Sequence, residues 1–390
     1  MTTVDAAESS VEQQRREMVA MARDFARTEI APHAAEWDRK KEYPADTVKR
    51  LGALGFLGML ISEELDGLGL DTLTYVMMIE EIAAADASVS ITLSVHNSLP
   101  SSILQAWGTP QQWERWLKPM ARGELLAAFC VSEAGSGSDV ASLDSRAVRN
   151  GTDWVLNGTK AWVTNGDVAD LLLVLVRTSD DATSRTRGLS FFMVPADTPG
   201  VEPTKPEDKM GLRASRTTQV VLTDVCLHAD HLIGEDGAGF QYAMEGLEGG
   251  RLGVAAQAVG IAQAALDHSI RYAAEREQFE VPIKDFQGIG FKLADMATRV
   301  AAARALLHDV ARAKERGEDV SMRASMAKLF ASEAAMFVTT EAVQVFGGYG
   351  YMRDYPVERL FRDAKVTEIY EGTSEVQRII ISRGLYAHDK

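Results

Sequence analysis

With 390 residues, of which 46% are hydrophobic and 25% charged, the chain has the composition of an ordinary soluble globular protein of two or three domains. Its formal charge of −15, from 41 basic and 56 acidic side chains, provides no basic surface for phosphates, so we expect no binding to nucleic acid.

Local composition sets further bounds. Residues 1–16 are polar and acidic, unlike a secretion signal, and the longest apolar run, Leu171 to Val176, is too short to cross a bilayer. Cys130 and Cys226 predict neither a disulfide framework nor a metal site. The sequence therefore predicts a cytoplasmic protein with reduced thiols and no membrane contact.

The first third of the chain has helical patterns. Residues 11–122 are rich in Ala and Leu, and segments 74–85 and 111–120 have the spacing of amphipathic helices. Proline and glycine divide this region into helical lengths, at Pro44, Gly67, Gly69 and Pro100. We predict an all-helical N-terminal domain over residues 1–125.

The pattern changes to short strands near Ala127. Residues 154–156 and 159–164 flank Asn157-Gly158, which is the signature of a β-hairpin. Further short apolar runs at 171–177, 189–194 and 219–222 are bounded by turn residues. These runs predict a middle antiparallel β domain over residues 126–236.

The last part of the chain returns to the helical period. Segments 252–272 and 321–346 have the length of long helices. Another segment has apolar residues three and four apart over seven turns: Phe286, Ile289, Leu293, Met296, Val300, Ala303, Leu307 and Val310. Such a seam is typical of a helix bundle, so we predict a C-terminal four-helix bundle over residues 237–390 and an α+β fold.

Two segments near the β domain have side chains suited to a ligand. The loop 129–139 contains two glycines and three serines, which could hold a phosphate or a heteroaromatic edge, or could simply be a mobile surface loop. On the segment 160–166, alternation places Trp162 and Thr164 on the same face of a strand. An indole beside a hydroxyl would suit a planar ring, although Trp162 could equally belong to the core.

Two segments of the helical bundle could bind phosphates. Arg251, Arg276 and Gln278 lie at or near predicted helix ends, where they could hold pyrophosphate and ribose, or could simply be solvated. The segment 344–351 has three glycines in four residues after a long helix, which are too many for a helix cap alone. Its glycines suggest a close approach of the backbone to a ligand or to a neighbouring subunit.

One carboxylate is a candidate general base. Glu371 lies between Tyr370 and Gly372, and the spacing from Ser374 to Gln377 could cap a new helix directly behind it. A carboxylate held between an aromatic residue and a tight turn can be fixed against a ligand. The alternative is an ordinary acidic residue near a helix start, where the helix dipole favours negative charge.

Taken together, these segments resemble the acyl-CoA dehydrogenase family. The resemblance extends from about residue 11 to residue 386, and its most specific motifs are segments 131–142, 344–365 and 369–378. It implies the fold of that family, with the N-terminal helical, middle β and C-terminal bundle domains predicted above.

The resemblance also implies an activity. Glu371 would remove the α-proton of an acyl-CoA thioester, and the β-hydrogen would leave as hydride to N5 of FAD, giving a trans-2-enoyl-CoA. The same likeness assigns substrate contacts to Ser138, Glu248, Arg251 and Gly372. It assigns contacts with FAD to Phe129, Cys130, Val131, Ser132, Ser138, Trp162, Val163, Thr164, Arg276, Gln278, Phe279, Gln287, Gln344, Val345, Phe346, Gly347, Gly348, Thr373, Ser374 and Glu375.

Two positions refine the comparison with the family. Some members carry the base immediately before the residue that matches Arg251, where this chain has Gly250, so Glu371 is the matching candidate. Glu280 stands where the family usually has glycine, which puts the backbone of that turn in question. The run 248–251 resembles short-chain, butyryl-CoA-type members.

The resemblance implies further properties and leaves alternatives. We expect fatty acid β-oxidation, electron transfer to an electron-transfer flavoprotein, and a homotetramer built as a dimer of dimers. The alternatives are an acyl-CoA oxidase, a flavin monooxygenase on the same fold, and a non-catalytic flavin- or CoA-binding scaffold. Oxidases of this kind usually carry an extra helical domain, and the monooxygenases usually lack the matching glutamate.

Overall fold

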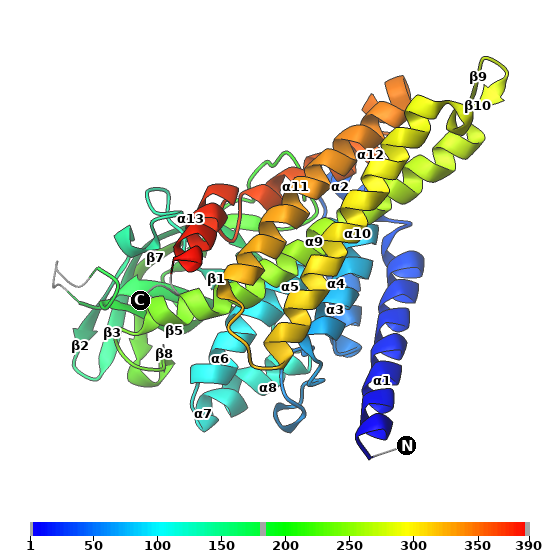
Figure 1. The fold of residues 1–390 in the computed structure, drawn as a ribbon. Coiled ribbons are helices and arrows are strands. Elements are labelled where there is room, and N and C mark those ends of the chain that lie inside the picture. Colours follow the sequence, from blue (N-terminus) through cyan, green and yellow to red (C-terminus); the bar gives the residue numbers. More distant parts are fainter. Residues whose placement is uncertain (1–2, 180–184, 387–390) are drawn as a thin grey trace.

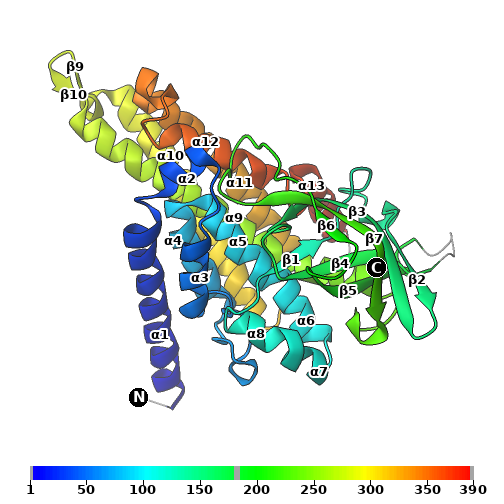
Figure 2. The same cartoon turned by 180° about the vertical axis from the view of Figure 1, so that it is seen from behind.

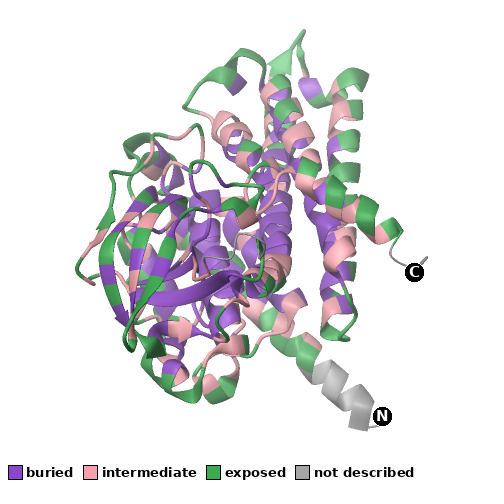
Figure 3. Cartoon of the chain, turned by 90° about the vertical axis from the view of Figure 1, so that its left-hand side faces the viewer, coloured by how far each residue is buried: buried purple, intermediate pink, exposed green. Residues whose placement is uncertain are grey.

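The computed structural model describes residues 3–179 and 185–386, and it has three regions in chain order (Figures 1 and 2). Helices form the first region, a β-sheet the second and long helices the third, so the predicted fold class is confirmed. Buried residues are concentrated in the middle of the molecule, and exposed residues cover the outer strands and loops (Figure 3). Among the described residues, no helix is both long and apolar enough to cross a membrane.

The N-terminal region is built of helices, of which Thr72–Ala85 packs against Thr3–Phe25 and Ala87–His96. The α-helices are α1 (Thr3–Phe25), α2 (Ala34–Lys40), α3 (Ala45–Ala53), α4 (Thr72–Ala85), α5 (Ala87–His96), α6 (Ser102–Trp107), α7 (Pro110–Gln112) and α8 (Lys118–Ala121). The prediction that segment 74–85 is amphipathic is wrong, because α4 is buried on nearly every side. Even Glu80 is buried there, where it pairs with Arg304 and His308 of the third region.

The β region is one eight-stranded sheet. Its strands are β1 (Ala127–Cys130), β2 (Arg146–Asn150), β3 (Asp153–Thr164), β4 (Leu171–Arg177), β5 (Leu189–Pro195), β6 (Val201–Pro203), β7 (Thr217–His228) and β8 (Leu232–Ile233). The main path runs β6-β7-β3-β2-β4-β5-β8, with β1 pairing β4. The sheet is antiparallel except that β4 pairs in parallel with β1 and, at one position, with β2. β4 is buried from Leu171 to Val176, which explains its uninterrupted apolar run.

The predicted hairpin at Asn157-Gly158 is wrong. The strand β3 continues through these residues, and the turn that joins β2 to β3 lies at 151–152. Asn157 exchanges two hydrogen bonds with Asp224 of β7, and the pairing register shifts beside it, between Leu156 and Gly158. Gly158 has a φ of 149°, and a Cβ there would lie 2.7 Å from the Cα of Ser145. The dipeptide therefore forms a β-bulge where another backbone approaches closely.

The C-terminal region contains three long helices and two shorter ones. They are α9 (Gly239–Glu275), α10 (Gln287–Glu315), α11 (Ser321–Phe346), α12 (Val357–Lys365) and α13 (Ser374–Leu385). The predicted seam lies on α10, where its last five members, from Met296 to Val310, are buried. A small hairpin of β9 (Glu277–Gln278) and β10 (Val281–Pro282) lies at the end of the bundle that is remote from the sheet (Figure 1).

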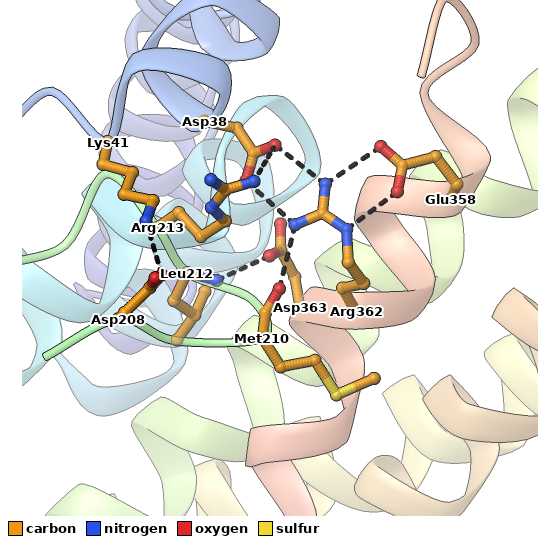
Figure 4. A network of polar contacts seen from close by, with 9 residues as sticks. All are labelled: Asp38, Lys41, Asp208, Met210, Leu212, Arg213, Glu358, Arg362 and Asp363. Atoms are coloured by element: carbon orange, nitrogen blue, oxygen red, sulfur yellow. Dashed lines mark hydrogen bonds and ion pairs between the residues drawn. The ribbon is translucent and has the colours of Figure 1, made fainter. Parts of the chain in front are cut away.

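A network of ion pairs joins the three regions (Figure 4). Arg362 of α12 donates to Asp38 of α2 at 2.8 Å and to Glu358 of its own helix at 2.7 Å. The next residue, Asp363, accepts a hydrogen bond of 2.6 Å from the backbone N–H of Leu212, in the segment before β7. Since α12 leads into the segment that carries Glu371, these contacts anchor that segment to all three regions.

Candidate active site

Glu371 lies on a strained turn between α12 and α13. Its φ is 51° and that of Gly372 is 93°, so two consecutive residues adopt the left-handed conformation that side chains usually avoid. The Glu371 carboxylate lies against α9: a Cβ at Gly250 would be 3.0 Å from its carboxyl carbon and would overlap Oε2. Gly250 therefore leaves the space that the carboxylate occupies.

The Glu371 carboxyl group is buried without a hydrogen bond. Neither carboxylate oxygen has a hydrogen-bond partner among the described residues. Burial raises the pKa of Glu371 to about 7, and the charges of Lys328 and then Arg251 act in the opposite direction. A buried, unpaired carboxylate is costly to keep, and a carboxyl group that titrates near neutral pH is suited to accepting a proton from a substrate.

Two buried side chains, those of Lys328 and Gln377, donate hydrogen bonds to the backbone of the Glu371 turn. Lys328 of α11 donates from Nζ to the carbonyl oxygen of Gly372 at 2.7 Å. Gln377 of α13 donates to the same oxygen at 2.9 Å and to the carbonyl of Glu371 at 3.3 Å. The helix α13 is capped by the hydroxyl of Thr373, which accepts from the backbone of Val376, so the predicted cap at Ser374 is wrong by one residue.

Lys328 was not predicted from the sequence, although a signal for it is present there. On a helix of residues 321–346, Lys328 lies four residues after Ala324 and three before Ala331, and both of these alanines are buried. A lysine on the apolar face of a long helix is unusual, because burying its charge is costly.

The face of α9 beside Glu371 is made of small residues. A Cβ at Gly246 would meet the side chain of Ile103 at 2.8 Å, and one at Gly253 would be 3.0 Å from the hydroxyl of Tyr75. Arg251 is buried, with no hydrogen-bond partner for its Nε among the described residues, and burial lowers its pKa. Because Gly246, Gly250 and Gly253 have no side chains, α4 and α6 approach α9 closely beside the carboxylate.

The predicted ligand residues of the β region differ in accessibility. Trp162 has a φ of 55° and is 58% exposed, so it is not a core residue. Strict alternation, on which the pairing of Trp162 with Thr164 was based, does not hold, because the register shifts between Lys160 and Val163. Phe129, Ser132 and Thr164 are half-buried, and Ser138 is exposed.

Three predicted ligand residues have side chains in the core. Cys130, Val131 and Val163 are buried, and burial raises the pKa of the Cys130 thiol to about 12. These three residues can contribute only backbone groups to a ligand. Close by, the buried ammonium group of Lys160 pairs with Glu133 at 2.7 Å and ties the loop 129–139 to β3.

A second set of predicted ligand residues lies at the far end of the bundle. They surround a cavity of about 900 Å³, whose lining includes Arg276, Gln278, Phe279, Val345, Phe346, Gly347 and Gly348. Gln287 and Gln344 are exposed on adjoining helix ends. Phe279 is 88% exposed, and no described atom lies within 4 Å of a Cβ at Gly347 or Gly348, so a ligand could approach this backbone closely.

The structure does not bring the two sets together within one chain. Arg251, a predicted substrate contact on α9, and Arg276, directly after the end of α9, are about 38 Å apart at 1.5 Å per residue. The hairpin β9-β10 and the sheet lie at opposite ends of the bundle (Figures 1 and 2). By contrast, Thr373, Ser374 and Glu375 are next to Glu371, and Glu248 and Gly372 also lie in its neighbourhood, half-buried.

Both sets have surfaces that fit parts of FAD. The exposed indole of Trp162 offers a flat face for a ring system, and the loop beside it contains Gly135 and Gly137, with no described atom within 4 Å of a Cβ at either. At the far end, Arg276 is placed beside the open backbone of Gly347 and Gly348, a combination suited to a pyrophosphate.

Known proteins match the chain along nearly its whole length. Three family models match consecutive parts: acyl-CoA dehydrogenase N-terminal domain over residues 12–124, middle domain over 128–225 and C-terminal domain over 237–386. The chain is 44% identical over 360 residues to the mitochondrial short-chain specific acyl-CoA dehydrogenase of Mus musculus, and the match covers 92% of this chain and 87% of that protein.

Two solved structures are similar in both sequence and fold. Butyryl-CoA dehydrogenase from Megasphaera elsdenii is 42% identical with a TM-score of 0.93, over 95% of this chain and 97% of that one. A chain in a structure of the electron transferring flavoprotein of Acidaminococcus fermentans is also 42% identical, with a TM-score of 0.94, over 96% of this chain and 98% of that one. The chain therefore belongs to the acyl-CoA dehydrogenase family, whose members are FAD-dependent oxidoreductases acting on CH–CH bonds.

Proposed function

We propose that the protein dehydrogenates a short, straight-chain acyl-CoA to the trans-2-enoyl-CoA, with Glu371 as the base that removes the α-proton. The observation that carries this proposal is the buried, unpaired carboxylate of Glu371, held on a left-handed turn against Gly250. Within residues 3–179 and 185–386 this carboxylate has no hydrogen-bond partner that would explain its burial, and its pKa of about 7 suits proton abstraction near neutral pH.

A base alone is not sufficient, because an α-proton beside a thioester is only weakly acidic. Negative charge develops on the thioester oxygen as the proton leaves, and a fixed N–H donor aimed at that oxygen contributes about 3–4 kcal/mol in measured cases. We assign that donor to the backbone N–H of Glu371, whose turn is held by Lys328 and Gln377. FAD, when bound, supplies the acceptor for the β-hydride.

The substrate contacts are proposed from the groups around Glu371. Arg251 and Glu248 are on the first third of α9, and Ser138 is exposed on the loop that faces solvent beside β1. The preference for a short chain is supported by the side chains that crowd the small face of α9, namely Leu99, Ile103 and the Tyr75–Ser94 pair. It also agrees with the two similar proteins that act on short-chain or butyryl-CoA substrates.

The remaining residues predicted to contact FAD require a second copy of the chain. Arg276 follows Arg251 by about 38 Å along α9, which places the far set of residues well away from the Glu371 site of the same chain. We therefore assign the ring end to the β region of one chain and the pyrophosphate end, at Arg276 and Gly347, to a partner chain, within a homotetramer. We propose the cytoplasm as its location and fatty acyl-CoA breakdown as its role.

The electron acceptor is proposed to be an electron-transfer flavoprotein. Support comes from the similar chain in the structure of such a flavoprotein from Acidaminococcus fermentans. The oxidase, monooxygenase and scaffold alternatives are not favoured, because the three family models are those of dehydrogenases. An oxidase would be recognised by rapid reoxidation of the reduced protein in air.

The test is an anaerobic titration of the FAD-loaded protein with straight, branched and long acyl-CoA thioesters, followed by flavin absorbance. We expect bleaching by butyryl-CoA at the lowest concentration, and none by any substrate in Glu371→Gln, which should still bind FAD. A wild-type protein that keeps its flavin and is bleached by no acyl-CoA contradicts the proposed reaction. A Glu371→Gln variant with near-normal bleaching contradicts the assignment of the base.

A further inference from the structure

Lys328 is the charged residue most completely removed from solvent near Glu371. Its side chain is fully buried on the inner face of α11, among alanine and serine residues. It donates to the carbonyl oxygen of Gly372 at 2.7 Å, directly behind the residue that carries the proposed base. Burial lowers the pKa of Lys328 to about 8, against the opposing effect of the Glu371 charge.

Packing alone does not explain a lysine at this position. Removing an ammonium group from water costs several kcal/mol after relaxation, and an apolar side chain of similar length would fill the same space without that cost. The Gly372 carbonyl, moreover, already accepts a hydrogen bond from Gln377 at 2.9 Å. What Lys328 adds to the turn is therefore a second donor and, above all, a positive charge.

We propose that Lys328 is a positioning residue for Glu371, holding its left-handed turn through the Gly372 carbonyl and keeping its buried carboxylate ionised as the working base. This role depends on the function proposed above for Glu371. Lys328 and Gln377 then have different roles, although both donate to the Gly372 carbonyl oxygen. Gln377 supplies a hydrogen bond without charge, whereas Lys328 supplies a hydrogen bond and a positive charge.

The charges around the carboxylate are consistent with this role. Arg251 of α9 is the other cation that acts on Glu371, and its effect on the pKa of Glu371 is smaller than that of Lys328. Tyr75 of α4 and Tyr370 are the neighbouring phenols; burial raises the pKa of both, and the charge of Glu371 raises it further. Glu368 and Glu375 act on Lys328 and help to keep it protonated.

Three variants separate the charge from the hydrogen bond. Lys328→Met removes both, in a side chain of similar length. Lys328→Gln removes the charge and keeps an N–H donor. This variant is compared with wild type if Lys328→Met fails to fold. Gln377→Met is the matched control, because it removes a donor to the same carbonyl oxygen and changes no charge.

The direct measurement is the ionisation of Glu371 by pH-difference infrared spectroscopy, with Glu371→Gln used to identify its carboxylic acid band. We expect both Lys328 variants to lower the acid dissociation constant of Glu371 at least tenfold, so that a higher pH is needed to ionise it. We expect Gln377→Met to change the same constant by less than about twofold. Flavin content and circular dichroism establish that each variant is folded.

The second measurement is the pH dependence of flavin bleaching by butyryl-CoA. We expect the rate in Lys328→Met to fall at least tenfold at pH 7 and to recover as the pH is raised. In Gln377→Met, any loss should be the same at every pH. Lys328 variants that titrate Glu371 as the wild-type protein does would overturn the proposal. If no acyl-CoA bleaches the wild-type flavin but the Glu371 band still shifts, only the proposed reaction fails.

Discussion

The Glu371 carboxylate occupies the volume that a side chain at Gly250 would require. A Cβ at Gly250 would lie 3.0 Å from the Glu371 carboxyl carbon and 3.4 Å from Cδ2 of Leu99. The two positions therefore exclude each other: a chain with a side chain at residue 250 could not hold its residue-371 carboxylate in the same place. This relationship links the glycine of α9 to the turn before α13, residues that are far apart in sequence.

Gly250→Ala should therefore displace the base. We expect bleaching by butyryl-CoA to slow about 100-fold, the usual cost of moving a catalytic group by about 1 Å, with FAD content unchanged. Gly249→Ala is the matched control, because the nearest atoms to its Cβ would be the Ser98 carbonyl oxygen at 3.4 Å and the Lys314 ammonium and Ser98 Cβ at 3.7 Å. Equal rates in the two alanine variants would show that the Gly250 contact does not position Glu371.

Glu371 should reduce the stability of the folded protein above neutral pH. Its pKa is raised by burial to about 7 from an ordinary value of 4.5, so the folded state holds a proton that the unfolded state releases between these values. Stability contributed by this group therefore falls as the pH rises from 4.5 to 7 and is constant above. We expect Glu371→Gln to raise the free energy of unfolding by about 2–3 kcal/mol at pH 8 and to have little effect at pH 4.

Thermal unfolding of Glu371→Gln and wild type at both pH values checks this expectation. Glu245→Gln, which changes an exposed carboxylate on α9, should alter stability by no more than about 0.5 kcal/mol at either pH. A Glu371→Gln variant that is less stable than wild type at pH 8 would mean that the carboxylate has a stabilising partner.

The β9-β10 turn should become more stable when Glu280 is replaced by glycine. Phe279 and Glu280 have φ values of 52° and 68°, the pattern of a two-residue hairpin turn that favours glycine in its second position. Glu280→Gly should relieve about 1 kcal/mol of backbone strain and slow amide hydrogen exchange in the hairpin. Glu277→Gly, at a strand position without positive φ, should instead destabilise the hairpin by about 0.5–1 kcal/mol.

Arg362 should be essential for the junction of the three regions. Its replacement by methionine leaves Asp38, whose side chain is only 10% exposed, without its closest cation, and breaking a buried pair in this way costs about 3 kcal/mol. Lys41→Met removes a neighbouring pair in the same network (Figure 4), but Lys41 and Asp208 are 44% and 76% exposed, so we expect a loss below about 1 kcal/mol. Similar unfolding midpoints for the two variants would argue against a structural role for Arg362.

Local patterns in the sequence were sufficient for the elements whose environment is uniform. The helix Ser321–Phe346 has the predicted bounds, and the strand Leu171–Arg177, which is buried as far as Val176, follows from its continuous apolar run. Such segments are decided by near neighbours along the chain, which the sequence displays directly. Glu371 was also recognisable, because its motif is local and specific.

Contacts between distant segments overrode local patterns elsewhere. Asn157-Gly158 has the composition of a hairpin turn, but β7 and Ser145 hold it as a bulge in a continuous strand. The spacing from Ser374 to Gln377 suggested a cap, but the cap is Thr373, and Gln377 instead donates to the carbonyls of the Glu371 turn. In each case, two arrangements are locally acceptable, and only the partner strand or turn selects between them.

The sequence by itself determined the order of the three regions and the family, and it predicts Glu371 as the base, because hydrophobic periods and specific motifs are properties of short segments. Only the tertiary structure decided that the Glu371 carboxyl group is buried without a hydrogen-bond partner among the described residues, that Gly250 makes room for it and that Lys328 donates to the Gly372 carbonyl. It alone also placed the hairpin residues and the sheet residues at opposite ends of the bundle (Figures 1 and 2). The physical reason is that burial, exclusion of volume and unscreened charge depend on which segments meet, and these segments are far apart in the chain.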